Sequence, residues 1–197
     1  MAKRLILLLV LCLAVPTTAF AASVKVRVEG KTKTLFGPTE ITVQASTPME
    51  AIEQASILGE LYYHVTTTSF GPYVDQVGRY GGSASAGWVF KVDDVSPPVG
   101  ADKVQLKDGD RVLWYYADFG PTGGPPTLRV TSATKKGCYA ATAYDDSGKP
   151  VAVTGLTWHV GSKKTVSGMT GSFCPGKHTG LLIRATATGA VRSNAVA

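Results

Sequence analysis

The chain has 197 residues, of which 17% are charged and 9% are aromatic, and its formal net charge at pH 7 is +6. This length allows one or two small domains. The Lys and Arg residues are scattered along the sequence, whereas nucleic-acid binding requires a basic stripe or patch, so we exclude nucleic acid as a partner.

The first segment, residues 1–21, has the pattern of a cleavable secretory signal peptide. Lys3 and Arg4 precede an apolar run over 5–15, and the Ala-Phe-Ala sequence at 19–21 fits the small-x-small cleavage rule. The run is about half of the roughly 20 residues that cross a bilayer, so we expect no membrane span after cleavage. We therefore predict an extracellular or cell-surface protein, whose formal charge falls from +6 to +4 because Lys3 and Arg4 leave.

A stretch rich in glycine and proline, residues 120–126, is predicted to be a linker, because these residues interrupt both helices and strands. It separates a first module, residues 22–119, from a second module, residues 127–197. Apolar residues at helical spacing occur only in the first module.

The first module is predicted to open with two strands and a helix. In residues 24–29 valine alternates with charged residues, as in a half-buried strand, and residues 40–43 form its expected hairpin partner. The helix is predicted to begin at Thr47, because Thr at the N-cap and Glu50 three residues later form a capping box. Apolar residues at helical spacing then follow over 51–61.

The remainder of the first module is predicted to be strands and loops. Residues 62–87 are rich in Tyr, Gly and Ser, and strands are expected at 87–92 and 111–116. One helix with four or five strands, in the order ββ-α-ββ, is a β-grasp layout. The predicted fold class of this module is therefore α+β.

The same module resembles a known family. The helix after a hairpin is followed by GWVFKVDD at 87–94, PVGAD at 98–102 and LKDGDRVLWYY at 106–116. In order and spacing these segments are similar to the β-grasp domain found at the C-terminus of transcobalamin and intrinsic factor, and in bacterial secreted and surface proteins. In the vertebrate relatives this domain helps to enclose cobalamin beside a large helical domain, and this chain has no helical repeats. The resemblance implies a corrinoid as one possible ligand.

The second module is predicted to be an all-β antiparallel sandwich. It has no helical periodicity, and turn signals such as the one at 145–150 separate short strand candidates. It also resembles, more loosely, the immunoglobulin-like or prealbumin-like modules of secreted bacterial proteins.

A disulfide between Cys138 and Cys174 is predicted in the second module. Cys12 is removed with the signal peptide, which leaves an even pair in an oxidising compartment. Metal binding by this pair is the poorer interpretation, because neither cysteine belongs to a C-x-x-C unit and His178 alone does not complete a four-ligand site.

We predict that the protein is not an enzyme and holds no cofactor. His64, His159 and His178 are far apart in sequence, and no nucleophile elbow, phosphate loop, H-E-x-x-H pair or calcium loop occurs. His64 lies near Asp75, so a catalytic pairing stays open, with a structural histidine as the favoured alternative.

Calcium binding is a further alternative, because five aspartates gather in the first module. Hard cations need six to eight oxygens from one site, whereas aspartate in turns accepts hydrogen bonds from its own backbone. We therefore assign these aspartates to turn structure and predict no metal site. The five are Asp93, Asp94, Asp102, Asp108 and Asp110.

Aromatic residues provide the candidate ligand site. Phe70, Tyr73 and Tyr80 lie in a Gly/Ser-rich region, and loops on a rigid scaffold often carry binding residues. Trp88 is a fourth candidate, with core packing as its alternative, and the loop itself could fold back over the sheet. We predict a secreted, non-catalytic module that binds a small ligand or a cell-surface component. The alternative is a structural or adhesive envelope protein in which the sandwich is a spacer.

Overall fold

The computed structural model describes residues 21–121, 123–166 and 171–197, so the predicted signal peptide, except Ala21, lies outside the described residues. The described part contains one helix, α1 (Pro48–Leu58). The strands are β1 (Ala22–Glu29), β2 (Thr34–Ala45), β3 (Tyr63–Thr68), β4 (Gly71–Val77), β5 (Tyr80–Gly81), β6 (Ala86–Val92), β7 (Arg111–Asp118), β8 (Thr127–Ser132), β9 (Tyr139–Tyr144), β10 (Pro150–Val151), β11 (Thr157–Val160), β12 (Lys163–Val166), β13 (Ser172–Phe173) and β14 (Ile183–Thr186).

The predicted α+β class is wrong, because the described residues are nearly all β and form several sheets. The ββ-α-ββ order also fails, since three strands stand between α1 and β6. Residues 63–77, expected as strands and loops, form the hairpin β3–β4, which pairs with β5 in a separate sheet. The run of β-branched residues over 65–68 favours the extended conformation, and Gly71 supplies the positive φ at the turn.

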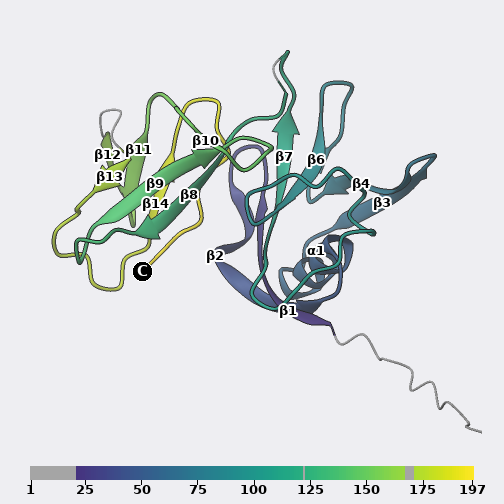
Figure 1. Cartoon of the computed structure of the whole chain (residues 1–197), viewed down its shortest axis with the longest axis horizontal. Helices are drawn as coiled ribbons and strands as arrows, with labels where there is room; N and C mark the ends of the chain where they lie inside the picture. Colours follow the sequence, from purple (N-terminus) through teal and green to yellow (C-terminus); the bar gives the residue numbers. More distant parts are fainter. Residues whose placement is uncertain (1–20, 122, 167–170) are drawn as a thin grey trace, which may run out of the picture.

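A central four-stranded sheet with the order β2-β1-β7-β6 organises the molecule. β1 is antiparallel to β2 and parallel to β7, and β6 is antiparallel to β7. Figure 1 shows α1 with β3 and β4 on one side of this sheet, and β8 to β14 on the other. Both faces of the sheet are therefore covered.

The first face of the sheet packs against α1. The helix begins where the capping box predicts: Thr47 Oγ1 accepts a hydrogen bond from the N–H of Glu50 at 3.2 Å. Ala51, Ile52 and Ala55 are completely buried on its inner side. They belong to one core cluster with the valines of β1 and the side chains of Trp88 and Trp114.

The second face of the sheet carries charged side chains that are also buried. Arg27 is 2% exposed and Glu29 is 1% exposed, and their side chains form an ion pair of 2.9 Å. We call residues 22–119 the N-terminal half and residues 127–197 the C-terminal half. Arg192, from the C-terminal half, also contacts Glu29, with 2.9 Å between Nη2 and Oε2. Charges are tolerated here because each has an oppositely charged or hydrogen-bonding partner.

Lys91 makes a second polar contact between the halves. Its ammonium is fully buried and donates to the carbonyl oxygens of Tyr144 at 3.2 Å and Asp145 at 2.7 Å. Burial lowers the pKa of Lys91, and the nearby Asp146 carboxylate opposes that shift.

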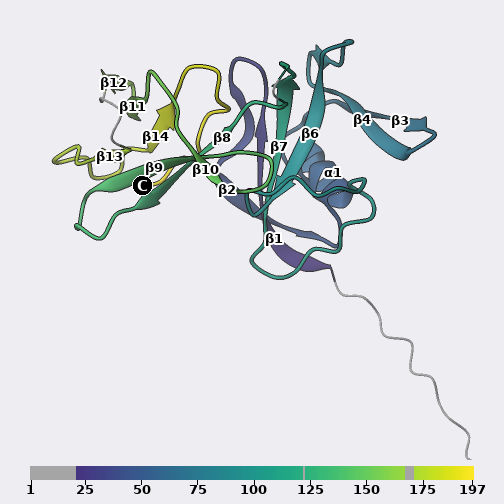
Figure 2. The same cartoon turned by 45° about the horizontal axis from the view of Figure 1, so that its top comes forward.

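Arg129 makes a third contact between the halves. It lies on β8 and reaches the Asp94 carboxylate at 2.7 Å and Glu40 at 3.3 Å, both in the N-terminal half. In Figure 2 the strands of the two halves lie side by side along this boundary. The halves are therefore joined by paired charges as well as by the chain.

The elements described after residue 126 are all strands. β9 pairs with β8, β10 and β13, and β11 pairs with β12 and β14. Their core is separate from that of the N-terminal half and includes Leu128, Trp158, Ile183 and Ala185, each at most 2% exposed.

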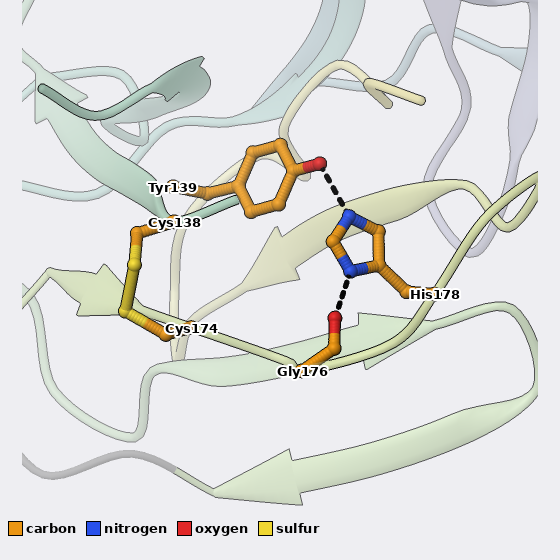
Figure 3. The surroundings of a disulfide bond; sticks show 5 residues. All are labelled: Cys138, Tyr139, Cys174, Gly176 and His178. Atoms are coloured by element: carbon orange, nitrogen blue, oxygen red, sulfur yellow. Dashed lines mark hydrogen bonds between the residues drawn. A yellow bond between two sulfur atoms is a disulfide. The ribbon is translucent and has the colours of Figure 1, made fainter. Parts of the chain in front are cut away.

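The predicted disulfide between Cys138 and Cys174 is confirmed. Figure 3 shows His178 beside it, where Nε2 contacts the Tyr139 hydroxyl at 2.7 Å and Nδ1 contacts the carbonyl oxygen of Gly176. Both nitrogens of His178 are therefore used in hydrogen bonds. Within the described residues, α1 is too short and polar to cross a membrane.

We expect the double variant Cys138→Ser/Cys174→Ser to lower the free energy of unfolding by about 3–4 kcal/mol, because the bond closes a long loop in the unfolded chain. Denaturant unfolding of the variant and the oxidised protein measures the difference. Reduction of the native protein should give the same loss, and an unchanged transition midpoint would contradict this expectation.

We expect Glu29→Gln to lower the free energy of unfolding by about 3 kcal/mol, because it leaves the buried Arg27 without its counter-charge. Glu53→Gln on the exposed side of α1 is the matched control and should change it by less than about 0.5 kcal/mol. An equal change in the free energy of unfolding of the two variants would show that the buried ion pair does not stabilise the protein.

Candidate ligand cleft

A cleft of about 290 Å³ runs along β6, the outer strand of the central sheet. Its lining comes from the start of α1, from β4, β6 and β7, from residues 96–101, and from Asp146 in the C-terminal half. Six aromatic residues contribute: Tyr73, Trp88, Phe90, Trp114, Tyr115 and Phe119. The cleft is therefore largely apolar and is assembled from distant parts of the sequence.

A second cavity, of about 520 Å³, adjoins the cleft at the turn of the hairpin β3–β4. The two share Pro72, Tyr73 and Gly100 in their linings. Phe70 lies at this turn and is 95% exposed. The two cavities therefore adjoin at these three residues, and we refer to them together as the groove from Trp114 to Phe70.

The four predicted ligand residues fall in different places. Tyr73 and Trp88 line the cleft, and Phe70 lines the adjoining cavity. Tyr80 lines neither; its hydroxyl is 2.8 Å from Thr32 Oγ1, and its ring lies 6.0 Å from that of Tyr116. The predicted rim is thus brought together only in part.

Trp88 forms a wall of the cleft while belonging to the core. It is 1% exposed, and its Nε1 donates to the carbonyl oxygen of Tyr80 at 2.7 Å. Its ring meets the ring of Tyr116 edge-on at 5.8 Å. Core packing thus dominates at Trp88, and the more exposed Tyr73 offers more surface to a ligand.

Tyr73 is held across the end of the cleft by a close contact with β6. Its hydroxyl lies directly over Gly87, where a methyl group would overlap it. Burial raises the pKa of the Tyr73 phenol, and the backbone N–H of Trp88 partly offsets that shift by hydrogen bonding. Glycine at position 87 is therefore needed for the tyrosine to approach the strand.

One polar group lies in the cleft, around Asp146. The Ser96 hydroxyl donates to Asp146 Oδ1 at 3.1 Å, and the buried Lys91 Nζ lies 3.5 Å from the same oxygen. Burial and the negative charge of Asp146 raise the pKa of Tyr115 beside them. The Ser96 hydroxyl thus donates to a carboxylate that also pairs with a buried ammonium.

His64 and Asp75, which the sequence left open as a catalytic pair, are in contact. Nδ1 of His64 is 2.7 Å from Oδ1 of Asp75, and the His64 side chain is 54% exposed on the β3–β4 hairpin. In the described part of the chain, no Ser, Thr or Cys side chain hydrogen-bonds this histidine. Neither residue lines the cleft.

The aspartates considered for calcium have other contacts. Asp108 accepts from the N–H of Ser23 at 2.8 Å, and Asp110 accepts from the N–H of Lys107 at 2.8 Å. Asp93 and Asp94 form ion pairs with Arg111. No group of three or more metal-ligating side chains occurs within residues 21–121, 123–166 and 171–197.

Sequence reasoning missed several lining residues. Phe90 and Trp114 lie on predicted strands, and the alternation that places them on the Trp88 face was a usable signal. Asp146 could not be found from sequence, because no local pattern shows that the turn after β9 meets the segment at Ser96. There the N–H of Ser96 donates to the carbonyl oxygen of Asp146 at 2.8 Å.

Comparison with known proteins matches one part of the chain to a family model. Residues 46–118 match the family described as "Domain of unknown function (DUF4430)", which covers α1 and β3 to β7. No curated protein matches the chain. A solved structure of a "putative metal binding protein" from Ruminococcus gnavus ATCC 29149 is similar with a TM-score of 0.39 and 14% identity, over 50% of this chain and 99% of that one. The matched family region contains all four predicted ligand residues.

We expect Gly87→Ala to lower the free energy of unfolding by about 1–3 kcal/mol, because the added methyl group displaces the Tyr73 hydroxyl. Gly81→Ala is the matched control, since nothing lies within 4 Å of the added methyl group there. Thermal unfolding compares the two, and equal stability of both variants would contradict the close contact.

Proposed function

We propose that the protein is a secreted, non-catalytic binding protein that holds a small, largely apolar ligand in the cleft along β6. The observation that carries this proposal is the gathering of six aromatic residues around one cleft whose described lining has a single charged side chain, Asp146. Ligand sites are typically concave and apolar, with few polar groups that orient the ligand.

The chemistry of the cleft favours binding over catalysis. Among the described residues, its lining includes no His, Cys, Lys, Arg or Glu side chain. Among the described lining residues, the Ser96 hydroxyl donates to the Asp146 carboxylate, which also pairs with Lys91 at 3.5 Å, and no histidine completes a nucleophile–base pair there. The His64–Asp75 pair lies on the hairpin, outside the lining.

The size of the cleft favours a ligand smaller than a whole corrinoid. Its volume of about 290 Å³ lies just below the range of about 300–1,000 Å³ for sites that enclose drug-sized ligands. The relationship to the transcobalamin domain stays a prediction from sequence, and a corrinoid is one of the ligands to be tested.

Secretion is part of the proposal. The N-terminal pattern predicts a signal peptide, and a disulfide such as Cys138–Cys174 persists in oxidising compartments. A cell-surface component is the alternative ligand, because the exposed Phe70 extends the apolar groove onto the outer surface of the hairpin.

The tryptophans provide a direct test of small-ligand binding. Trp88 and Trp114 line the cleft, whereas Trp158 is buried in the C-terminal core and serves as an internal control. With ¹⁵N-labelled indoles, we expect 2-naphthol or indole to shift the resonances of Trp88 and Trp114 but not that of Trp158, whereas cyanocobalamin, as a whole corrinoid, should shift them little.

The matched variants are Phe90→Ala in the cleft and Ile57→Ala on the exposed side of α1. Loss of the Phe90 ring should weaken binding about 5-fold or more, from the lost apolar contact, and Ile57→Ala should leave it unchanged. Equal shifts of all three indoles, or no shift with any compound, would overturn the proposed cleft.

A further inference from the structure

The outer edge of β6 faces the cleft. β6 is the last strand in the order β2-β1-β7-β6, so the central sheet pairs with only one of its two edges. Three consecutive residues of this strand, 88–90, line the cleft. The cleft therefore follows the peptide backbone of β6 as well as its side chains.

The backbone groups of Phe90 point toward this outer edge. The N–H of Asp93 donates to Arg111 on the β7 side at 2.9 Å, whereas the N–H of Val92 donates to Val95 on the opposite side at 2.9 Å. Alternate residues of an antiparallel strand direct their N–H and C=O to the same edge, so Phe90 shares the edge of Val92. Among the residues that the structure describes, no group bonds the Phe90 backbone there.

The neighbouring positions of the outer edge are already used. The hydroxyl of Tyr73 contacts the backbone of Trp88, and Val95 forms a bridge with Val92. Pro72 and Pro97, which also line the cleft, have no N–H to offer the strand. Within the described residues, Phe90 therefore has an unbonded donor–acceptor pair on the outer edge, between the contacts at Trp88 and Val92, and this pair opens into an apolar cleft.

We infer that the ligand of this cleft is an extended peptide that pairs with β6 at Phe90 and places an apolar side chain among the aromatic residues. The inference rests on the proposed function and names the class of ligand. In this mode of recognition, main-chain hydrogen bonds supply affinity and side-chain pockets supply specificity. The groove from Trp114 to Phe70 gives the peptide a path beyond the paired position.

The negative charge of Asp146 favours particular side chains in this peptide. The secreted protein is basic overall, because its formal charge is +6 for the full chain and +4 without Lys3 and Arg4, yet the described lining of the cleft contains Asp146 and no Lys or Arg. The Asp146 side chain is 48% exposed, while its partner Lys91 is completely buried, so an incoming cation reaches the carboxylate first. The peptide is therefore apolar and basic rather than acidic.

The probes are end-blocked hexapeptides in which Val or Tyr alternates with Lys. We expect them to shift the indole resonances of Trp88 and Trp114, and to slow hydrogen exchange of the Phe90 amide about tenfold or more. Matched hexapeptides that are N-methylated at the apolar positions lose main-chain donors and should bind about 3- to 10-fold more weakly. Matched hexapeptides with Glu in place of Lys should also bind more weakly, because Asp146 repels them.

The matched variants are Phe90→Pro and Phe90→Ala, which both remove the ring, while only proline removes the N–H. Proline is tolerated in edge strands where the N–H faces away from the sheet. We expect peptide binding by Phe90→Pro to be about 3- to 10-fold weaker than by Phe90→Ala, with far-ultraviolet circular dichroism as the check of folding. The N-methylated hexapeptides test the same hydrogen bonds on the unchanged protein.

The outcomes separate this inference from the proposed function. If neutral aromatic compounds shift Trp88 and Trp114 but no hexapeptide binds up to millimolar concentration, or N-methylation has no effect, the peptide inference is overturned and small-ligand binding stands. If neither compounds nor peptides shift the resonances of Trp88 and Trp114, the proposed function and the peptide inference are both overturned.

Discussion

The structure depends on a central sheet that is buried on both faces. Side chains of successive residues in a strand point to opposite faces, so each strand must satisfy two different environments. In β1 the valines meet α1, while Arg27 and Glu29 meet the C-terminal half. Arg192 supplies a second partner for Glu29, and the turn after β9 supplies partners for the buried Lys91 on β6. The C-terminal half therefore satisfies buried charges of the sheet.

The same arrangement produces the cleft. β2 ends the sheet on one side and β6 on the other, and the outer edge of β6 is only partly covered by neighbouring segments. The turn that pairs with Lys91 also brings Asp146 to the cleft, beside Ser96. Contacts that hold the two halves together thus also shape the candidate binding site. A substitution that disturbs the contact between Lys91 and Asp145 would therefore also displace Asp146, the next residue, which lines the cleft.

Local patterns predicted local structure. The capping residues Thr47 and Glu50 marked the start of α1, because their hydrogen bonds involve only neighbours in the chain. The disulfide followed from cysteine count and compartment. The fold class failed because the glycines and serines of residues 62–87 outweighed the β-branched run over 65–68, which forms a hairpin.

Long-range features could not be predicted in the same way. Tyr73 and Tyr80 were grouped because they share a region of one composition, but strand pairing places Tyr73 at the cleft and Tyr80 near Thr32. Asp146 enters the site across more than fifty residues from Phe90, and only tertiary packing brings the two together. Sequence therefore indicated the region of the candidate cleft, and the structure was needed to find its polar group.

The charge pairs at the boundary also bear on how such a chain evolves. Arg129 and Arg192 lie in one half, and their partners Asp94 and Glu29 lie in the other. Recombination that exchanged one half for an unrelated module would leave buried charges without partners, at a cost of several kcal/mol for each. A glycine- and proline-rich linker normally lets modules be shuffled freely. Here we expect the two halves to be inherited as a unit, with substitutions at these positions arising in compensating pairs.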